Sequence, residues 1–164
     1  MIRFRRSLPR LCGFALALLA GLAGAQDYRI GDLEVLAPWS QELPPSAPTA
    51  AAYFTVRNTG MADDYLLGVD SPVASEAQLH EHIGADGMMK MQQVEGVIIP
   101  AAGQVRFAPM GSHVMLLGLG DRSQLVDGAS FPLTLHFQNA GDLQVQVQVF
   151  AQPPEGAGMH EHGG

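Results

Sequence analysis

The sequence contains a single cysteine among its 164 residues, Cys12, and this cysteine lies in an N-terminal segment that we expect to be removed. Without that segment the chain has no thiol, which excludes disulfides, iron–sulfur clusters and cysteine-based structural zinc sites. Cysteine nucleophiles and the thiolate of a blue-copper electron-transfer centre are excluded for the same reason. Stability must therefore come from core packing, and a soft metal site must use other ligands.

Basic residues are also scarce. Four of the nine arginines and lysines lie within the first ten residues, so residues 26–164 contain five against sixteen acidic residues, a formal charge of −11. Such a chain is a poor partner for nucleic acid or an anionic lipid surface. No Ser-His-Asp or paired-carboxylate arrangement indicates hydrolysis, so we expect a binding protein and not an enzyme.

The first 25 residues have the composition of a secretory signal peptide. Four arginines precede or flank an apolar run at residues 11–22, and Ala23-Gly24-Ala25 supplies small residues for a signal peptidase. The run is too short to span a bilayer comfortably, and Cys12 lacks the small residues that precede a lipid-modified cysteine. We expect cleavage of residues 1–25, export to the periplasm and no stable membrane insertion; a lipid-anchored form is the less favoured alternative.

Long helical periodicity is absent after the leader, whereas short apolar segments of period two recur between turn residues. Leucine and valine alternate with glutamine over residues 143–149, and a similar alternation over 133–137 precedes a turn at 139–142, which predicts a hairpin. Further strands are expected near residues 28–36, 51–58, 65–70, 77–82, 88–94, 104–107 and 114–119. About nine short strands predict an all-β, antiparallel two-sheet sandwich.

The chain after the leader has 139 residues, a length that suits one compact domain. We expect this domain over residues 26–151. Residues 152–164 contain two prolines and several glycines with little to bury, which predicts a flexible C-terminal tail.

Two histidines and two methionines in the middle of the chain form a spaced pattern, His80, Met91, His113 and Met115. Positions i and i+2 of a strand point to the same face, so His113 and Met115 can aim at one point. Imidazole nitrogen and thioether sulfur favour Cu(I), whereas zinc rarely takes methionine and calcium or magnesium needs oxygen. The four residues therefore predict one Cu(I) site of uncharged donors, from which copper can exchange to a partner's softer thiolates.

Neighbouring residues leave part of this ligand set open. His82 shares a strand face with His80 and is the first substitute for it, and Met89 shares a face with Met91 if that segment is extended. Met110 could supply a spare thioether or be a loop residue, and we favour the loop residue because single exposed apolar side chains are common.

A second candidate site lies at the C-terminus, where Met159, His160 and His162 accompany a glutamate. Nitrogen and oxygen donors of this kind suit Cu(II). The alternative is a solvated tail with weak metal affinity, because ordering two histidines of a disordered chain costs entropy. His136 is expected to have no metal role, since it lies on the threonine and glutamine face of the hairpin without a local partner.

The pattern H-x10-M-x21-H-x-M resembles that of the periplasmic copper chaperones called PCu(A)C. The resemblance extends through Trp39 and residues 52–60, 79–81, 94–96 and 113–116, and it covers nearly the whole chain after the leader. Similar proteins often have Pro-Gly-Gly before the second histidine, whereas this chain has Pro109-Met110-Gly111-Ser112. The resemblance implies a cupredoxin-like β-sandwich that binds Cu(I) near its surface at the four matching positions.

The resemblance also implies a function and partners. Proteins of this family supply copper to the binuclear copper centre of cytochrome c oxidase, so we expect transfer to oxidase subunit II, with a Sco-type protein as a further partner. The alternative is a periplasmic scavenger or buffer for copper uptake or tolerance, because a donor and a store share the same ligands. In either role we expect a monomer.

Overall fold

The structure is a computed structural model that describes residues 28–85 and 88–157. These residues form eleven β-strands and one short 3-10 helix, η1 (Arg122–Gln124), so the predicted all-β class is confirmed. The strands are β1 (Tyr28–Ile30), β2 (Leu33–Gln41), β3 (Thr49–Asn58), β4 (Asp64–Asp70), β5 (Ala74–Ala85), β6 (Met88–Gln93), β7 (Val97–Ile99), β8 (Gln104–Phe107), β9 (His113–Leu119), β10 (Ser130–Phe137) and β11 (Gly141–Phe150). The predicted leader at residues 1–25 lies outside the described residues.

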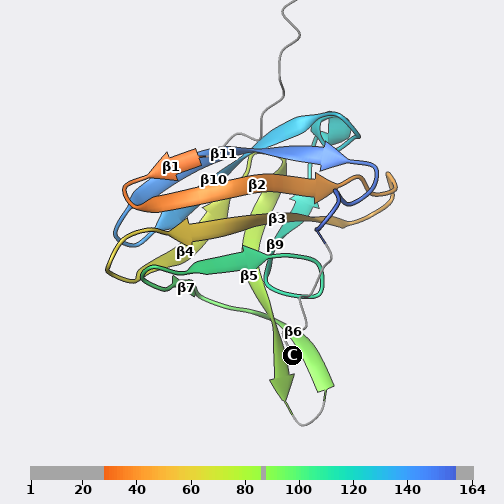
Figure 1. Cartoon of the computed structure of the whole chain (residues 1–164). Helices are drawn as coiled ribbons and strands as arrows, with labels where there is room; N and C mark the ends of the chain where they lie inside the picture. The colour runs from red at the N-terminus through yellow and green to blue at the C-terminus, as the bar shows by residue number, and fades with distance from the viewer. Residues whose placement is uncertain (1–27, 86–87, 158–164) are drawn as a thin grey trace, which may run out of the picture.

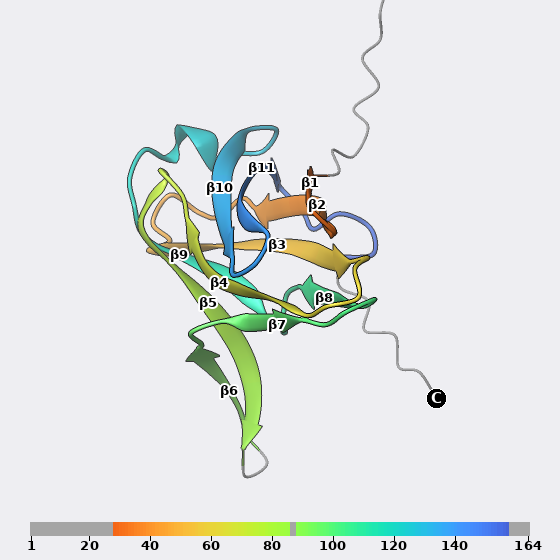
Figure 2. The ribbon, with the colours of Figure 1, turned by 90° about the vertical axis from the view of Figure 1, so that its left-hand side faces the viewer.

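The strands form one hydrogen-bonded network in the order β6-β5-β9-β3-β2-β11-β10-β4-β7, with β1 paired to β2 and β8 paired to β3. The network curls over on itself, so that β4 contacts β5 while β7 contacts β3 and β8. Figures 1 and 2 show the curled body and the hairpin of β5 and β6 that extends beyond it. Because β6 ends the path, this hairpin has one free edge.

The strand count exceeds the expected nine at two places. A turn at Gly31, whose φ of +56° suits glycine, divides the predicted strand 28–36 into β1 and β2. The three-residue β7 was not predicted, since a run so short carries little pattern. The expected antiparallel pairing holds for every described pair of strands except β11 with β2, which is parallel, with Gln148 opposite Trp39.

One core fills the curled network. Alternate residues of β3 and β10 are buried, as the period-two pattern predicts. The largest fully buried side chains include Phe107, Phe131, Leu116 and Leu133. Full burial of such a side chain contributes about 1.5–3 kcal/mol. On β9 the core side chains are Val114 and Leu116, so the alternate residues of that strand lie on the outer face.

The predicted hairpin of β10 and β11 is confirmed, with Leu135 opposite Leu143. The expectation that His136 has no local partner is wrong. His136 Nδ1 lies 2.8 Å from Asp142 and Nε2 lies 2.7 Å from Asp70 of β4. Asp142 is directly opposite His136 in the hairpin register, whereas Asp70 comes from a strand whose pairing is not evident in the sequence.

The chain after β11 runs back over the body. Ala157 is buried, and the guanidinium of Arg106 on β8 donates a hydrogen bond to the carbonyl oxygen of Gly156. Met159, His160 and His162 lie outside the described residues. Among the residues described, no helix is long and apolar enough to cross a membrane.

Candidate metal centre

Strand pairing brings the two predicted histidine ligands together. Residue His80 of β5 is directly opposite His113 of β9, and their ring centroids are 5.6 Å apart. Leu79 and Val114, the next pair along the same two strands, are buried in the core. Successive residues of a strand point to opposite faces, so both imidazoles lie on the outer face of the sheet. Met115 follows His113 by two residues and therefore shares that face.

Met91 reaches the same face from the edge strand. It lies on β6 directly opposite His82, whereas the residue opposite His80 is Gln93. Met91 is thus a diagonal neighbour of His80, within reach of a long side chain. It is 49% exposed, whereas His113 is 5% exposed. The four predicted residues therefore lie on one face of β6, β5 and β9, and His82 lies there with them.

Hydrogen bonds fix which nitrogen of two imidazoles is free. His113 Nδ1 lies 3.0 Å from the carbonyl oxygen of Gly111, and His82 Nδ1 lies 2.7 Å from that of Met110. A carbonyl oxygen only accepts, so each Nδ1 carries the proton and donates it. In the neutral ring each Nε2 is then the nitrogen available to a metal, and a backbone carbonyl that orients the ring in this way is typical of metal-binding histidines.

His80 has the opposite tautomer because of Glu76 and Gln78, the two polar residues that precede it on the same face of β5. Gln78 Nε2 donates to Glu76 Oε1 at 2.6 Å, which turns Gln78 Oε1 toward His80 Nε2 at 2.9 Å. The amide oxygen accepts, so His80 Nε2 carries the proton and Nδ1 carries the lone pair. Among the described residues, His80 Nδ1 is the one buried side-chain nitrogen or oxygen without a hydrogen-bond partner.

A buried nitrogen without a hydrogen-bond partner is costly, and a bound cation would satisfy it. Burial, and secondarily the charge of His113, lower the pKa of His80. The ring is therefore neutral near pH 7, the form in which imidazole binds a metal.

Aromatic side chains close one side of the face. The Tyr53 ring lies 6.4 Å from that of His113, and Trp39 lies against Tyr53 at 4.7 Å. Burial raises the pKa of Tyr53, so its hydroxyl remains protonated over the physiological range. These rings cover His113 from the side of β3 and β2, which leaves Met91 and His82 toward solvent.

The donor types on this face limit the metal. In the described part of the chain, no group of three or more histidine, cysteine, aspartate or glutamate residues is placed to hold a metal ion. The thioethers of Met91 and Met115 are further donors that this face offers. Thioether and neutral imidazole donors suit a soft ion of low charge, Cu(I) above all.

The other candidate ligands from the sequence are Met110, Met89 and the C-terminal residues. Met110 is 72% exposed and has a φ of +65°, and its contact with His82 is made by the backbone carbonyl. The side chain of Met89 lies outside the described residues, as does the tail site. Sequence reasoning missed Glu76 and Gln78; their i−4 and i−2 spacing from His80 on a strand was the available signal.

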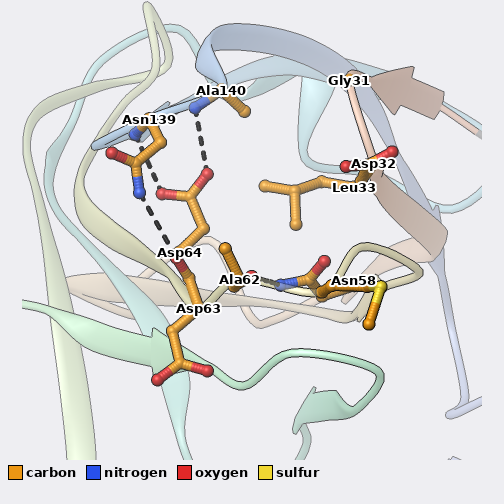
Figure 3. A pocket seen from close by; sticks show the side chains of 10 residues that line it. Gly31, Asp32, Leu33, Asn58, Ala62, Asp63, Asp64, Asn139 and Ala140 are labelled. Carbon is orange, nitrogen blue, oxygen red and sulfur yellow. Dashed lines mark hydrogen bonds between the residues drawn. The ribbon is translucent and has the colours of Figure 1, made fainter.

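A shallow hollow elsewhere is lined by the turn between β1 and β2, the loop before β4 and the turn between β10 and β11 (Figure 3). The buried carboxylate of Asp64 accepts hydrogen bonds there from the backbone N–H groups of Asn139 and Ala140, each at 2.9 Å. Asp63 accepts from the N–H of Ala101 at 2.8 Å. These carboxylates hold loops together, so the hollow is part of the fold.

Comparison with known proteins agrees with this architecture. The model of a family described as "Putative lipoprotein LpqE-like" matches residues 33–149. A curated protein of Leifsonia xyli subsp. xyli, also described as a putative lipoprotein, is 38% identical over 100 residues, which are 60% of this chain. The match spans 59% of that protein's length.

Solved structures of PCuAC domains have the same fold. The copper-bound PCuAC domain from PmoF2 is 25% identical with a TM-score of 0.67, covering 77% of this chain and 99% of that domain. The Cu(I) form of DR1885 from Deinococcus radiodurans is 30% identical with a TM-score of 0.60, covering 79% and 84% of the two chains. The predicted cupredoxin-like fold and the resemblance to PCu(A)C proteins are thereby confirmed. The chain belongs to the LpqE-like family and has the β fold of a PCuAC domain.

Proposed function

We propose that this protein is a periplasmic copper chaperone that binds one Cu(I) ion through His80, Met91, His113 and Met115. The observation that carries the proposal is the buried, unprotonated Nδ1 of His80, which lies without a partner on the face of His113. Similar domains have been solved with copper bound, one of them with Cu(I). These neighbours support copper as the cargo.

The donor chemistry suits a carrier. Two neutral imidazoles and two thioethers leave the bound Cu(I) site with a net charge of +1, because no carboxylate among them neutralises the ion. Thioethers also form no disulfides in an oxidising compartment. Copper held in this way can pass by ligand substitution to the thiolates of a recipient, which are softer donors.

Competition titration against a Cu(I) chelator tests the binding site. The wild type should bind one Cu(I) tightly, and Met91→Leu combined with Met115→Leu should weaken binding by more than about 100-fold. Met61→Leu is the matched control, because Met61 is 99% exposed and lies in the loop before β4. Unchanged affinity in the double variant would rule out the thioether ligands.

The recipient that we propose is the binuclear copper centre in subunit II of cytochrome c oxidase, with a Sco-type protein as a further partner. The half-exposed Met91 would give a recipient's thiolate access to the ion. Mixing the Cu(I)-loaded protein with the apo subunit II domain should move copper to that domain. Retention of the ion would favour the second candidate, a copper buffer with the same donors.

We also propose that the protein is exported to the periplasm and that its first 25 residues are cleaved off. Mass spectrometry of the protein from the periplasm should give Gln26 as the first residue, and Cys12→Ser should leave secretion unchanged. Incorporation of a labelled fatty acid that depends on Cys12 would contradict the proposal and indicate a lipid-anchored form.

The C-terminal residues Met159, His160 and His162 remain a proposed Cu(II) site. Truncation after Ala157 removes these three residues and keeps the buried alanine and the contact of Arg106 with Gly156. We expect the truncated protein to lose a weak Cu(II) site, measured by electron paramagnetic resonance titration, and to keep its Cu(I) affinity.

A further inference from the structure

The donors on the outer face are arranged in two layers along β5. His80 is in register with His113, and Met115 is opposite Gln78, one step further into the body. His82 lies one step outward and is in register with Met91 on the projecting hairpin. Figure 2 shows that β5 and β6 continue beyond the body in this direction. The inner layer is thus held by the body and the outer layer by the hairpin.

The His113 imidazole contacts both layers. Its ring centroid is 5.6 Å from that of His80 and 6.2 Å from that of His82. The two contacts are nearly equal in length, and both histidines meet the His113 ring edge-on. A metal ion bound by His113 could therefore take either His80 or His82 as its second imidazole.

Hydrogen bonds set the tautomer of both alternative imidazoles. His80 keeps its proton on Nε2 against Gln78, while His82 keeps its proton on Nδ1 against the carbonyl of Met110. In the neutral form, each ring therefore offers one nitrogen lone pair to a metal. The hydrogen bond of His82 is short, 2.7 Å, so its ring is oriented before any metal arrives.

We infer that His82 is an exit ligand: Cu(I) leaves the inner donors His80 and Met115 for an outer set of His82, Met91 and His113, from which a recipient takes it. The inference rests on the proposed Cu(I) binding. It assigns resting binding to His80, whose Nδ1 is buried, and release to the hairpin, where Met91 is half-exposed.

The displacement balances without a redox or proton-transfer step. The bonds from copper to His80 Nδ1 and Met115 sulfur break, and a bond to His82 Nε2 forms, while His113 and Met91 stay bound. Copper remains Cu(I), and each exchanging ring binds through the nitrogen that carries no proton, so no proton is transferred. The resulting three-coordinate ion has an open position for a thiolate of the recipient.

Comparison of equilibrium affinity with transfer rate tests the inference. In His82→Gln we expect the affinity for Cu(I) to stay within about threefold of wild type, because the resting ligands are intact. Stopped-flow transfer of Cu(I) to a dithiol peptide should be about tenfold slower, a barrier increase of about 1.4 kcal/mol. In His80→Gln the affinity itself should fall.

His136→Gln is the matched control, because His136 lies on β10 and its nitrogens are bonded to Asp70 and Asp142. The His136→Gln variant should change neither the Cu(I) affinity nor the rate of Cu(I) transfer. A wild-type transfer rate in His82→Gln would overturn the inference, as would a loss of affinity equal to that of His80→Gln. Absence of tight Cu(I) binding by the wild type would instead refute the proposed function.

Nitrogen-15 imidazole spectra of the wild type give a second measurement that does not depend on the folding of a variant. In the loaded protein, His80 Nδ1 and His113 Nε2 should show metal-bound shifts, and His82 Nε2 should not. Addition of the dithiol peptide below stoichiometry should broaden His82 Nε2 by exchange. A His82 signal unaffected during transfer would contradict the inference.

Discussion

The imidazoles of His80 and His113 occupy directly paired positions of two antiparallel strands, with ring centroids 5.6 Å apart. Backbone hydrogen bonds of the sheet set this separation, so the two donors are placed together before any metal binds. Both strands also contribute buried residues to the core through Leu79 and Val114. Loading should therefore need side-chain adjustment only, which lowers the ordering cost of binding.

The amide of Gln78 should control the affinity of the site without touching the metal. Gln78→Leu removes the acceptor that holds the proton of His80 on Nε2, so the ring can turn or change tautomer. We expect Cu(I) affinity to fall by about 10-fold to 100-fold with little change in the midpoint of thermal unfolding. Chelator competition and calorimetry measure the two effects.

The exchange Glu76→Gln with Gln78→Glu is the matched control for that variant. It reverses the donor and acceptor of the pair and replaces the amide oxygen in front of His80 Nε2 with a carboxylate oxygen, which is also an acceptor. Affinity should recover in this double variant. If Gln78→Leu binds Cu(I) as the wild type does, the amide has no positioning role.

Tyr53 should contribute to stability as the link between Trp39 and His113. Tyr53→Ala removes an aromatic contact and half-buried surface, and we expect the free energy of unfolding to fall by about 1–3 kcal/mol. Tyr53→Phe keeps the ring and should stay close to wild type. Urea unfolding followed by the emission of Trp39, the sole tryptophan of the chain, measures both variants.

The strands were predictable where apolar residues alternate along one sheet face. Residues 133–137 and 143–149 have this alternation, and β10 and β11 form there. The shape of β2 was not predictable in this way. Its register shifts between Leu36 and Trp39, where Ala37 has a φ of +47°, and this bulge lets a strand continue through Pro38. Whether a bulge forms depends on packing against β3, which the local sequence does not contain.

The candidate site was predictable as a set of residues but not as a layout. The i, i+2 rule places His113 and Met115 on one face from sequence alone. The register of β5 against β9 and β6 is a long-range property, and it alone decides that His80 faces His113 while Met91 faces His82. The proton positions depend in turn on partners such as Gln78 and the carbonyl of Met110, which are brought into contact only by that register.

The Asp64 side chain should be essential for the corner that joins β4 to the turn between β10 and β11. Its buried carboxylate accepts from the N–H groups of Tyr65, Asn139 and Ala140. Asp64→Ala leaves these donors without their partner, so we expect a loss of at least about 2 kcal/mol in the free energy of unfolding. Asp63→Ala removes one exposed hydrogen bond and should cost less than about 1 kcal/mol. Equal losses in urea unfolding would contradict this account.

Protonation of His136 should stabilise the fold at mildly acidic pH. The hydrogen bond to Asp142 first, and that to Asp70 second, raise the pKa of His136 above its usual 6.5. A folded-state pKa above the unfolded value means that the stabilisation is complete below about 6.5 and disappears as pH rises through the folded pKa. His136→Gln should therefore lower the midpoint of thermal unfolding more at pH 5.5 than at pH 8.5.

The matched control for this pH dependence is Asp70→Asn with Asp142→Asn, which keeps the histidine and removes both negative partners. In that background His136→Gln should have a similar effect at the two pH values. An equal effect of His136→Gln on the wild-type protein at both pH values would show that the ion pairs contribute no stability. That outcome is the usual one for fully exposed pairs. The ring of His136 is bonded at both nitrogens, however, and this fixed geometry is the reason to expect a measurable difference.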